Sequence, residues 1–230
     1  MSNMTNSINA AYASLVEVSQ RSPTQIDFDD ITFHATLKES DMSVIYLISS
    51  HGENYVMKLF HIYPGDLKDD EILFRNELMA YQRLSACGLS DKGMICRLFG
   101  SVTNIDPAIN ETWLNPFIND AFRPCAVFLE YIPDLREINS DTYTKQRWIR
   151  ATEIQNEILR AGVLHDDIYN NAMFSVNMIS EERVVWLDFD RAQTFDRDIR
   201  ETPSAIFQID QIRKLGLDLE KAHEEGVPSW

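Results

Sequence analysis

The chain has 230 residues, of which 44% are hydrophobic and 25% are charged, as is usual for a soluble globular protein. Its 36 acidic residues outnumber its 21 basic residues and give a formal net charge of −15. This charge argues against a nucleic-acid-binding surface and against binding to anionic membranes, because both need clustered lysine and arginine. No run of 18 consecutive apolar residues occurs, so no transmembrane helix is predicted.

The first part of the chain, residues 1–25, is expected to be a polar tail with a short helix near Ala10–Gln20. It lacks a basic start followed by an apolar run, so a secretory signal is not predicted. Cys87, Cys96 and Cys125 are odd in number and have no paired spacing. They fit buried or semi-buried thiols in a reducing compartment rather than disulfides or a zinc site. We therefore expect a cytoplasmic location, and a nuclear one is also compatible with the sequence.

Residues 26–133 alternate short apolar runs with polar turns, which predicts five strands. One amphipathic segment between the third and fourth strands starts with acidic residues and is followed by Gly88, as a helix would be. The segment between the last two strands, Asn104–Arg123, is expected to be a long polar loop that acts as an insertion, a lid or a partner surface. The predicted strands are 31–38, 43–50, 54–61, 94–104 and 124–132, and the predicted helix is 69–88.

Residues 134–230 have a different character, and we place a domain boundary near Pro133. An amphipathic helix over 145–162 ends at a glycine, and a polar loop with the sequence HDDIYNN follows it. A hairpin is predicted next, with one strand before and one strand after the turn sequence SEER. A last helix is expected over Ser204–Glu225.

Lys58 lies in the apolar strand sequence YVMKLF, where its side chain points away from the face of Met57 and Leu59. It can be an edge-strand lysine that reaches solvent, or a phosphate-binding lysine held by an acid from a packed helix. The following helix offers Glu77, which lies near the apolar face of that helix. By itself Glu77 is also compatible with an ordinary solvated acid.

Two acidic motifs follow in the second part of the chain. Asp167 lies in the loop sequence LHDDIYNN, whereas Asp188 and Asp190 lie where the apolar strand VVWLDFD ends. An unpaired carboxylate at Asp188, directly after Trp186 and Leu187, is costly, and Mg²⁺ would offset that cost, because Mg²⁺ prefers carboxylates, phosphates and water. Asp190 is either a second metal ligand or a turn residue. A hairpin between the two motifs would bring a proton-accepting carboxylate and a metal-binding one together, which is what phosphoryl transfer needs.

These motifs, in this order, resemble those of the protein-kinase-like superfamily. The resemblance covers about 160 residues, from Ile31 to Arg191, in the sequences YVMKLF, FRNELMAY, FLEYI, LHDDIYNN and WLDFD. WLDFD is also similar to the corresponding motif of aminoglycoside and choline kinases. The resemblance implies an α+β, bilobal protein-kinase-like fold. Its N-lobe would be a five-stranded antiparallel sheet with one helix, and its C-lobe would be reduced and mainly helical.

The resemblance also implies roles for single residues. Lys58 would bind nucleotide phosphates and Glu77 would hold it, whereas the backbone of Glu130–Ile132 would face the adenine. Asp167 would be the catalytic base, and Asp188 would bind Mg²⁺. ATP and Mg²⁺ are therefore the expected cofactors, with an unknown phosphate acceptor or protein as partner.

Three departures from the family pattern oppose this interpretation. The sequence TLKESDMSVIY has no glycine where a glycine-rich phosphate loop is expected. The expected position of the metal-binding asparagine is Ala172, so Asn171 is a second metal ligand only if the register shifts by one residue. Few residues follow the DFD motif, and DQIRKLG resembles the next kinase helix only faintly. His165 is either the loop-bracing histidine of the motif or an ordinary loop residue.

Three functions are compatible with these observations. The first is an ATP-dependent phosphotransferase with a reduced C-lobe, supported by Lys58, Glu77, Asp167 and Asp188. The second is a catalytically impaired pseudokinase that acts as a binding or scaffold module, supported by the missing glycines. The third is an unrelated acidic α+β interaction protein.

Overall fold

The computed structural model describes residues 26, 30–63, 73–168, 174–177 and 183–227. Within these residues the protein is α+β, with a five-stranded antiparallel sheet and four α-helices. The chain divides into two compact units. The first unit contains the chain up to Leu78 together with Leu98–Tyr131, and the second contains Met79–Arg97 and Ile132 onward. The expected boundary near Pro133 and the expected tail over 1–25 remain predictions.

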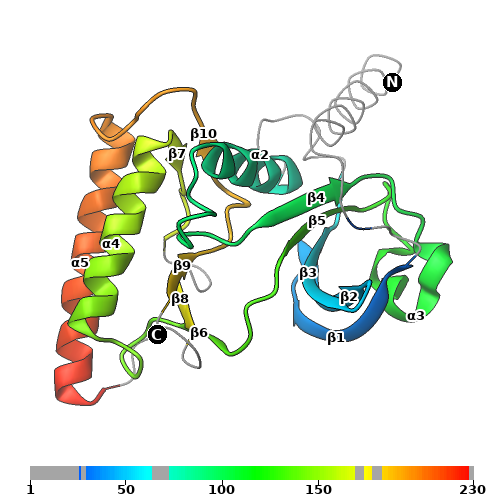
Figure 1. Ribbon diagram of the computed structural model, residues 1–230, viewed down its shortest axis with the longest axis horizontal. Coiled ribbons are helices and arrows are strands. Elements are labelled where there is room, and N and C mark those ends of the chain that lie inside the picture. The colour runs from blue at the N-terminus through cyan, green and yellow to red at the C-terminus, as the bar shows by residue number, and fades with distance from the viewer. Residues whose placement is uncertain (1–25, 27–29, 64–72, 169–173, 178–182, 228–230) are drawn as a thin grey trace. The chain divides into compact units, whose positions relative to one another are not determined.

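The first unit is built on the sheet, whose strands lie in the order β1-β2-β3-β5-β4 (Figure 1). Every neighbouring pair is antiparallel, as hairpin connections between short strands favour. His51 and Gly52, with φ of 50° and 84°, make the two-residue turn between β2 and β3. The bounds are β1 Thr32–Glu39, β2 Ser43–Ser50, β3 Glu53–Phe60, β4 Leu98–Val102 and β5 Cys125–Glu130.

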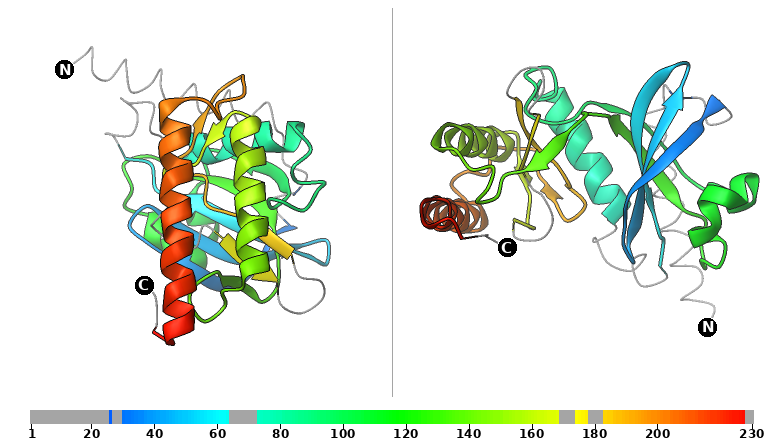
Figure 2. Two further views of the ribbon diagram at one scale, coloured as in Figure 1. Left: turned by 90° about the vertical axis from the view of Figure 1, so that its left-hand side faces the viewer. Right: turned by 90° about the horizontal axis from the view of Figure 1, so that it is seen from below.

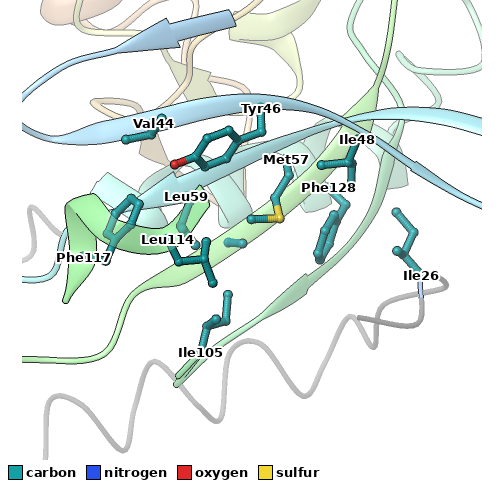
Figure 3. Packing of buried hydrophobic residues seen from close by; sticks show 11 residues of the cluster. Ile26, Val44, Tyr46, Ile48, Met57, Leu59, Ile105, Leu114, Phe117 and Phe128 are labelled. Atoms are coloured by element: carbon teal, nitrogen blue, oxygen red, sulfur yellow. The ribbon is translucent and has the colours of Figure 1, made fainter. Parts of the chain in front are cut away.

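Residues 104–123, which we expected to form a loop because they are mostly polar, cover one face of the sheet. Residues 104–123 instead contain η2 (Pro107–Asn110), α3 (Glu111–Leu114) and η3 (Asn115–Phe117). Ile105, Leu114 and Phe117 are buried against this face of the sheet, as Figure 3 shows. The expectation of an open polar loop was wrong, because a few apolar residues suffice to anchor a short segment when the sheet supplies the other half of the core.

The same core receives buried apolar side chains that lie two positions apart along β2 and along β3. Val44, Tyr46 and Ile48 from β2 and Met57 and Leu59 from β3 point into it (Figure 3). The Tyr46 hydroxyl donates a hydrogen bond to the Trp113 carbonyl oxygen at 2.6 Å, which ties the covering segment to the sheet. The intervening β3 residue, between Met57 and Leu59, must therefore point to the opposite face.

Helix α2 (Leu73–Ala86) lies at the predicted place, although residues 69–72 of the predicted span fall outside the described part of the chain. The helix ends at Ala86, and Gly88, whose φ is 77°, follows two residues later. The Gly88 N–H donates to the Ser85 carbonyl and the Leu89 N–H donates to the Leu84 carbonyl. These bonds satisfy carbonyl groups that a helix end leaves open, as glycine-terminated helices commonly do.

The second unit contains two long helices that lie side by side, α4 (Lys145–Arg160) and α5 (Pro203–Glu225) (Figure 2). The hydroxyl oxygens of Thr144 and Thr202 accept hydrogen bonds at their N-termini. A Cβ atom at Gly216 of α5 would lie 2.1 Å from Trp148 Nε1, so the indole of α4 packs where only glycine leaves room. Trp148 thus sets the approach of the two helices.

Two small sheets complete the second unit. The predicted hairpin is present as antiparallel β8 (Phe174–Asn177) and β9 (Arg183–Trp186). The sequence did not predict β6 (Leu135–Glu137), β7 (Val163–Leu164) or β10 (Gln193–Thr194), because strands of two or three residues carry no detectable alternation. The helix expected near Ala10–Gln20 lies outside the described residues. Among the described helices, none is both long and apolar enough to cross a membrane.

Candidate functional site

Lys58 lies on β3, on the sheet face opposite the core that receives Met57 and Leu59. Its side chain is not at a solvent edge, because the residue is only 4% exposed and β3 is paired on both sides. Its Nζ atom lies 2.7 Å from Glu77 Oε2 and 5.0 Å from the centre of the Phe60 ring. The edge-strand interpretation of Lys58 is therefore wrong, and the expected pairing with the helix acid is present.

Glu77 belongs to the buried stripe of α2 and is 1% exposed. Phe74 and Leu78 of the same helix are also buried, and Phe74 contacts Phe60 edge-to-face. The spacing of these residues by one to four positions places them on adjacent parts of one helix face. Glu77 is consequently not the solvated helix acid that its type alone would favour.

A buried ion pair of this kind is not explained by stability. Moving two charges out of water costs as much as their attraction returns, and apolar residues of similar volume often do as well. Buried charges held by specific partners are common where a protein handles a charged ligand. The pair therefore marks the first unit as the place to look for an anion-binding function.

The residues predicted to face an adenine ring lie at the end of β5. Glu130 is the last residue of that strand and is paired with Tyr55 of β3. Ile132 is buried and begins the second stretch of the second unit. Their assignment to nucleotide binding stays a prediction.

In the second unit, the loop that follows β7 is held from α5. The backbone N–H groups of His165 and Asp166 both donate to Gln208 Oε1 at 3.1 Å. Gln208 is 3% exposed and lies more than forty residues further along the chain. One glutamine side chain thus fixes the backbone directly before Asp167.

The His165 ring is enclosed in the same unit. It is 1% exposed, and its Nε2 atom lies 2.9 Å from the Leu187 carbonyl oxygen, so Nε2 carries the proton and donates. Burial lowers the pKa of His165, while the Leu187 carbonyl and the carboxylates of Asp188, Asp167 and Asp190 act in the opposite direction. Through this hydrogen bond, the neutral His165 ring links the HDD loop (residues 165–167) to the backbone directly before Asp188.

The two acids of the loop have different surroundings. Asp166 has a left-handed backbone, with φ of 60°, and its Oδ2 atom accepts a hydrogen bond from Gln193 Nε2 at 2.8 Å. Asp167 forms an ion pair with Arg191, whose Nε atom lies 3.3 Å from Asp167 Oδ2. Asp167 is partly exposed, so a solute can reach the carboxylate that is predicted to be the base.

In the DFD motif, Phe189 is buried, whereas Asp188 and Asp190 are half-buried. Phe189 is fully buried, with ring centres 5.0 Å from His165 and 5.2 Å from Tyr81. Asp188 has a left-handed backbone with φ of 63°, which costs a residue with a side chain roughly 1–2 kcal/mol. Such strain persists where the surroundings fix it, and it is common at functional sites.

Asp188 and Asp190 are suited to share a cation. Their carboxylate oxygens lie within 4.8 Å of each other, on either side of the buried Phe189. Mg²⁺ commonly takes two carboxylate ligands from a protein when phosphate oxygens and water supply its remaining ligands. Asn171, the other predicted metal ligand, lies outside the described residues, as does Ala172.

Sequence reasoning missed Gln208, Arg191 and Gln193, which surround the HDD loop. For Gln208 a signal exists, because Ala205, Gln208 and Ile212 follow one another at helical spacing. A polar residue inside an apolar stripe must find a buried hydrogen-bond partner. Arg191 and Gln193 carry no such signal.

Comparisons with known proteins do not assign the chain to a family. A scan of the chain against family models gave no match, and a search among curated proteins gave none either.

Proposed function

We propose that the chain is a divergent kinase-like protein that binds ATP and Mg²⁺ and transfers the γ-phosphate to a hydroxyl acceptor. The first unit would be the small lobe and the second a reduced, mainly helical large lobe. The observation that carries the proposal is the buried ion pair between Lys58 and Glu77, at 2.7 Å. A lysine in the middle of a strand, oriented by a helix carboxylate, supplies a fixed positive charge for phosphate oxygens.

Each candidate residue then has a chemical task. Lys58 would bind phosphate oxygens, and Glu77 would keep its ammonium group oriented. Asp188 and Asp190 would hold Mg²⁺, which supplies charge neutralisation for the phosphates when bound. Asp167 would accept the proton of the attacking hydroxyl, and the bond between the γ-phosphorus and its bridging oxygen would break to release ADP.

The fixed geometry around these acids supports the proposal. Gln208 holds the backbone before Asp167, and His165 binds the carbonyl before Asp188. Phosphoryl transfer depends mainly on positioning and charge, so rigid support of both acids is what the reaction requires. The net charge of −15 would otherwise repel free ATP, which makes the local lysine and metal essential. A cytoplasmic location is part of the proposal, because all three cysteines are free thiols.

The second candidate function is that of a pseudokinase, a binding or scaffold module without turnover. The turn between β1 and β2 favours it. That turn has no glycine, and Ser40 Oγ accepts hydrogen bonds from the N–H groups of Met42 at 3.3 Å and Ser43 at 3.1 Å. Backbone amides that are engaged in this way are not available to cradle phosphates.

The experiment that tests the proposal separates binding from chemistry. Unfolding temperature is measured with and without millimolar Mg-ATP, and ADP release is measured with candidate acceptors. A ligand that binds only the folded state raises the unfolding temperature. Asp188→Asn should abolish the Mg²⁺-dependent shift, whereas Asp167→Asn should keep the shift and lower turnover roughly 10²- to 10⁴-fold.

Asp91→Asn is the matched control, because Asp91 is exposed and lies outside both acidic motifs. It removes the same charge and should leave both readouts unchanged. A shift without any turnover would favour the pseudokinase. The absence of any shift with Mg-ATP would reject the phosphotransferase and favour either a pseudokinase that does not bind nucleotide or an acidic interaction protein.

A further inference from the structure

The second unit contains a concave pocket beside the HDD loop, with a volume of about 580 Å³. Its walls come from that loop and from the first turns of α5. The chemistry-bearing residues that line it are Asp166, Asp167, Ser204, Phe207, Gln208 and Gln211. Pockets of this volume are typical of sites for small molecules.

Gln208 gives the pocket a polar group without a protein partner. Its Oε1 atom is used by the N–H groups of His165 and Asp166. Its Nε2 atom is buried and has no hydrogen-bond partner among the residues that the structure describes. Buried amide groups are almost always hydrogen-bonded, so the amide nitrogen of Gln208, a residue that lines the pocket, still needs an acceptor oxygen.

Phe207 supplies the apolar side of the pocket. The residue is 63% exposed, which is a high value for an aromatic side chain. Phe207 and Gln208 both line the pocket. A ring-shaped molecule with an apolar C–H face would cover the Phe207 ring and remove it from water.

The charges around Asp167 restrict the ligand further. The Arg191 guanidinium already offsets the Asp167 carboxylate at 3.3 Å and would repel an ammonium group. Asp166 and Asp167 together would repel an anion, as would the net charge of −15. A neutral ligand avoids both penalties.

We propose that this pocket holds the phosphate acceptor, and that the acceptor is a neutral cyclic polyol such as a sugar or a cyclitol. One hydroxyl oxygen of the ring accepts from Gln208 Nε2, and a second hydroxyl donates to Asp167. The ring lies against Phe207. The inference rests on the proposed function, since it assigns the acceptor of the same reaction: the second hydroxyl attacks the γ-phosphorus, its proton passes to Asp167, and ADP leaves.

The test measures binding and transfer separately in the full-length protein. Saturation-transfer NMR without nucleotide compares glucose, ribose and myo-inositol with cationic glucosamine and anionic glucuronate. ADP release is then measured with each compound and Mg-ATP. We expect at least one neutral polyol to bind and to accept phosphate, and the two charged compounds to bind less well.

Two variants locate the site. Phe207→Ala removes an exposed ring and should weaken polyol binding by roughly tenfold, as truncation of a contact aromatic typically does. Ile206→Ala is the control, because Ile206 is similarly exposed on the same helix but does not line the pocket. Gln208→Glu keeps the Oε1 acceptor for the loop but removes the amide donor, and it should also weaken polyol binding.

The outcomes distinguish this inference from the proposed function. If Mg-ATP stabilises the protein and a charged acceptor is phosphorylated while no neutral polyol binds, the polyol assignment is overturned and the phosphotransferase stands. Equal binding by Phe207→Ala and Ile206→Ala overturns the pocket. A polyol that binds at this pocket while Mg-ATP has no effect overturns the acceptor role together with the proposed function.

Discussion

Lys58 Nζ and Glu77 Oε2 lie 2.7 Å apart in the interior of the first unit, and both residues are at most 4% exposed. Each charge therefore compensates the other at short range. The pair makes the sheet and α2 interdependent, because Lys58 comes from β3 and Glu77 from the helix.

The first prediction concerns the two single variants and the double variant of this pair. Lys58→Met and Glu77→Leu should each lower the free energy of unfolding by about 3–5 kcal/mol, because each removes the ion-pair partner of a buried charge. Lys58→Met/Glu77→Leu should be more stable than either single variant. Urea denaturation of the four proteins gives the coupling energy directly.

Arg150→Met serves as the control for that cycle. Arg150 pairs with Glu153 on the surface of α4 at 3.1 Å, with both side chains well exposed. Exposed pairs contribute at most about 1 kcal/mol, so this variant should change the unfolding free energy little. Equal losses for Arg150→Met and Lys58→Met would contradict the buried position of Lys58.

The second prediction concerns Gly162, which follows α4. Its φ is 90°, and a Cβ atom there would lie 2.4 Å from the Phe195 carbonyl oxygen and 2.5 Å from that of Arg197. Gly162→Ala must therefore move backbone and not only a side chain. We expect a loss of more than about 2 kcal/mol in the unfolding free energy, since left-handed strain and overpacking add.

Gly88→Ala separates the two causes of that loss. Gly88 also has a positive φ, 77°, but a Cβ atom there would meet nothing within 4 Å. It should cost only the left-handed strain of about 1–2 kcal/mol. If thermal unfolding shows the two variants equally destabilised, the close approach of Phe195 is not a constraint on the fold.

The sequence was sufficient for the large elements, because their signals are local. The alternation in β2 and β3, and the helical spacing in α4 and α5, predicted all four elements to within a few residues. β7 and β10 were missed because their two-residue pairing exists only through the tertiary fold. The left-handed backbone of Asp188 was also unpredictable, since only a minority of aspartate residues adopt it and no local sequence signal marks which do.

For the candidate site, the sequence identified charged residues but not what holds them. It suggested that Glu77 pairs with Lys58, and the structure has that pair. It could not choose between a solvated and a buried Lys58, because that depends on the strands on both sides of β3. Gln208 and Arg191 were missed, since their contacts to the HDD loop join residues that are distant in sequence.

The third prediction tests whether residues 104–123 belong to the core of the first unit. Phe117 is 1% exposed and stacks on His61 with ring centres 4.2 Å apart. Phe117→Ala should lower the unfolding free energy by about 3–5 kcal/mol. Ile118→Ala is the control, because the neighbouring Ile118 is largely exposed and should cost no more than about 0.5 kcal/mol. A small loss for Phe117→Ala would show that the segment is an appended loop.

The last prediction concerns His165 and pH. Burial lowers the pKa of this ring in the folded protein, whereas the unfolded chain keeps a value near 6.5. Below pH 6.5 the unfolded state therefore binds more protons than the folded state, so this residue's contribution to stability is complete above that pH. It is lost as the pH falls from 6.5 through the lowered pKa. Protonation would also give the His165 ring a second N–H group, at Nδ1, and Nδ1 has no hydrogen-bond partner among the described residues.

His165→Gln removes the titrating imidazole. The glutamine amide nitrogen takes the place of the histidine Nε2 atom as the donor to the Leu187 carbonyl oxygen. Unfolding free energies are measured by urea denaturation with EDTA present, at pH 7.5 and at pH 5.5. The wild-type protein should lose more stability over this interval than His165→Gln, by at most about 1.4 kcal/mol per pH unit below 6.5. The other ionisable groups are common to both proteins, so their contributions cancel in the difference. Parallel pH curves for the two proteins would mean that His165 is not buried as a neutral ring.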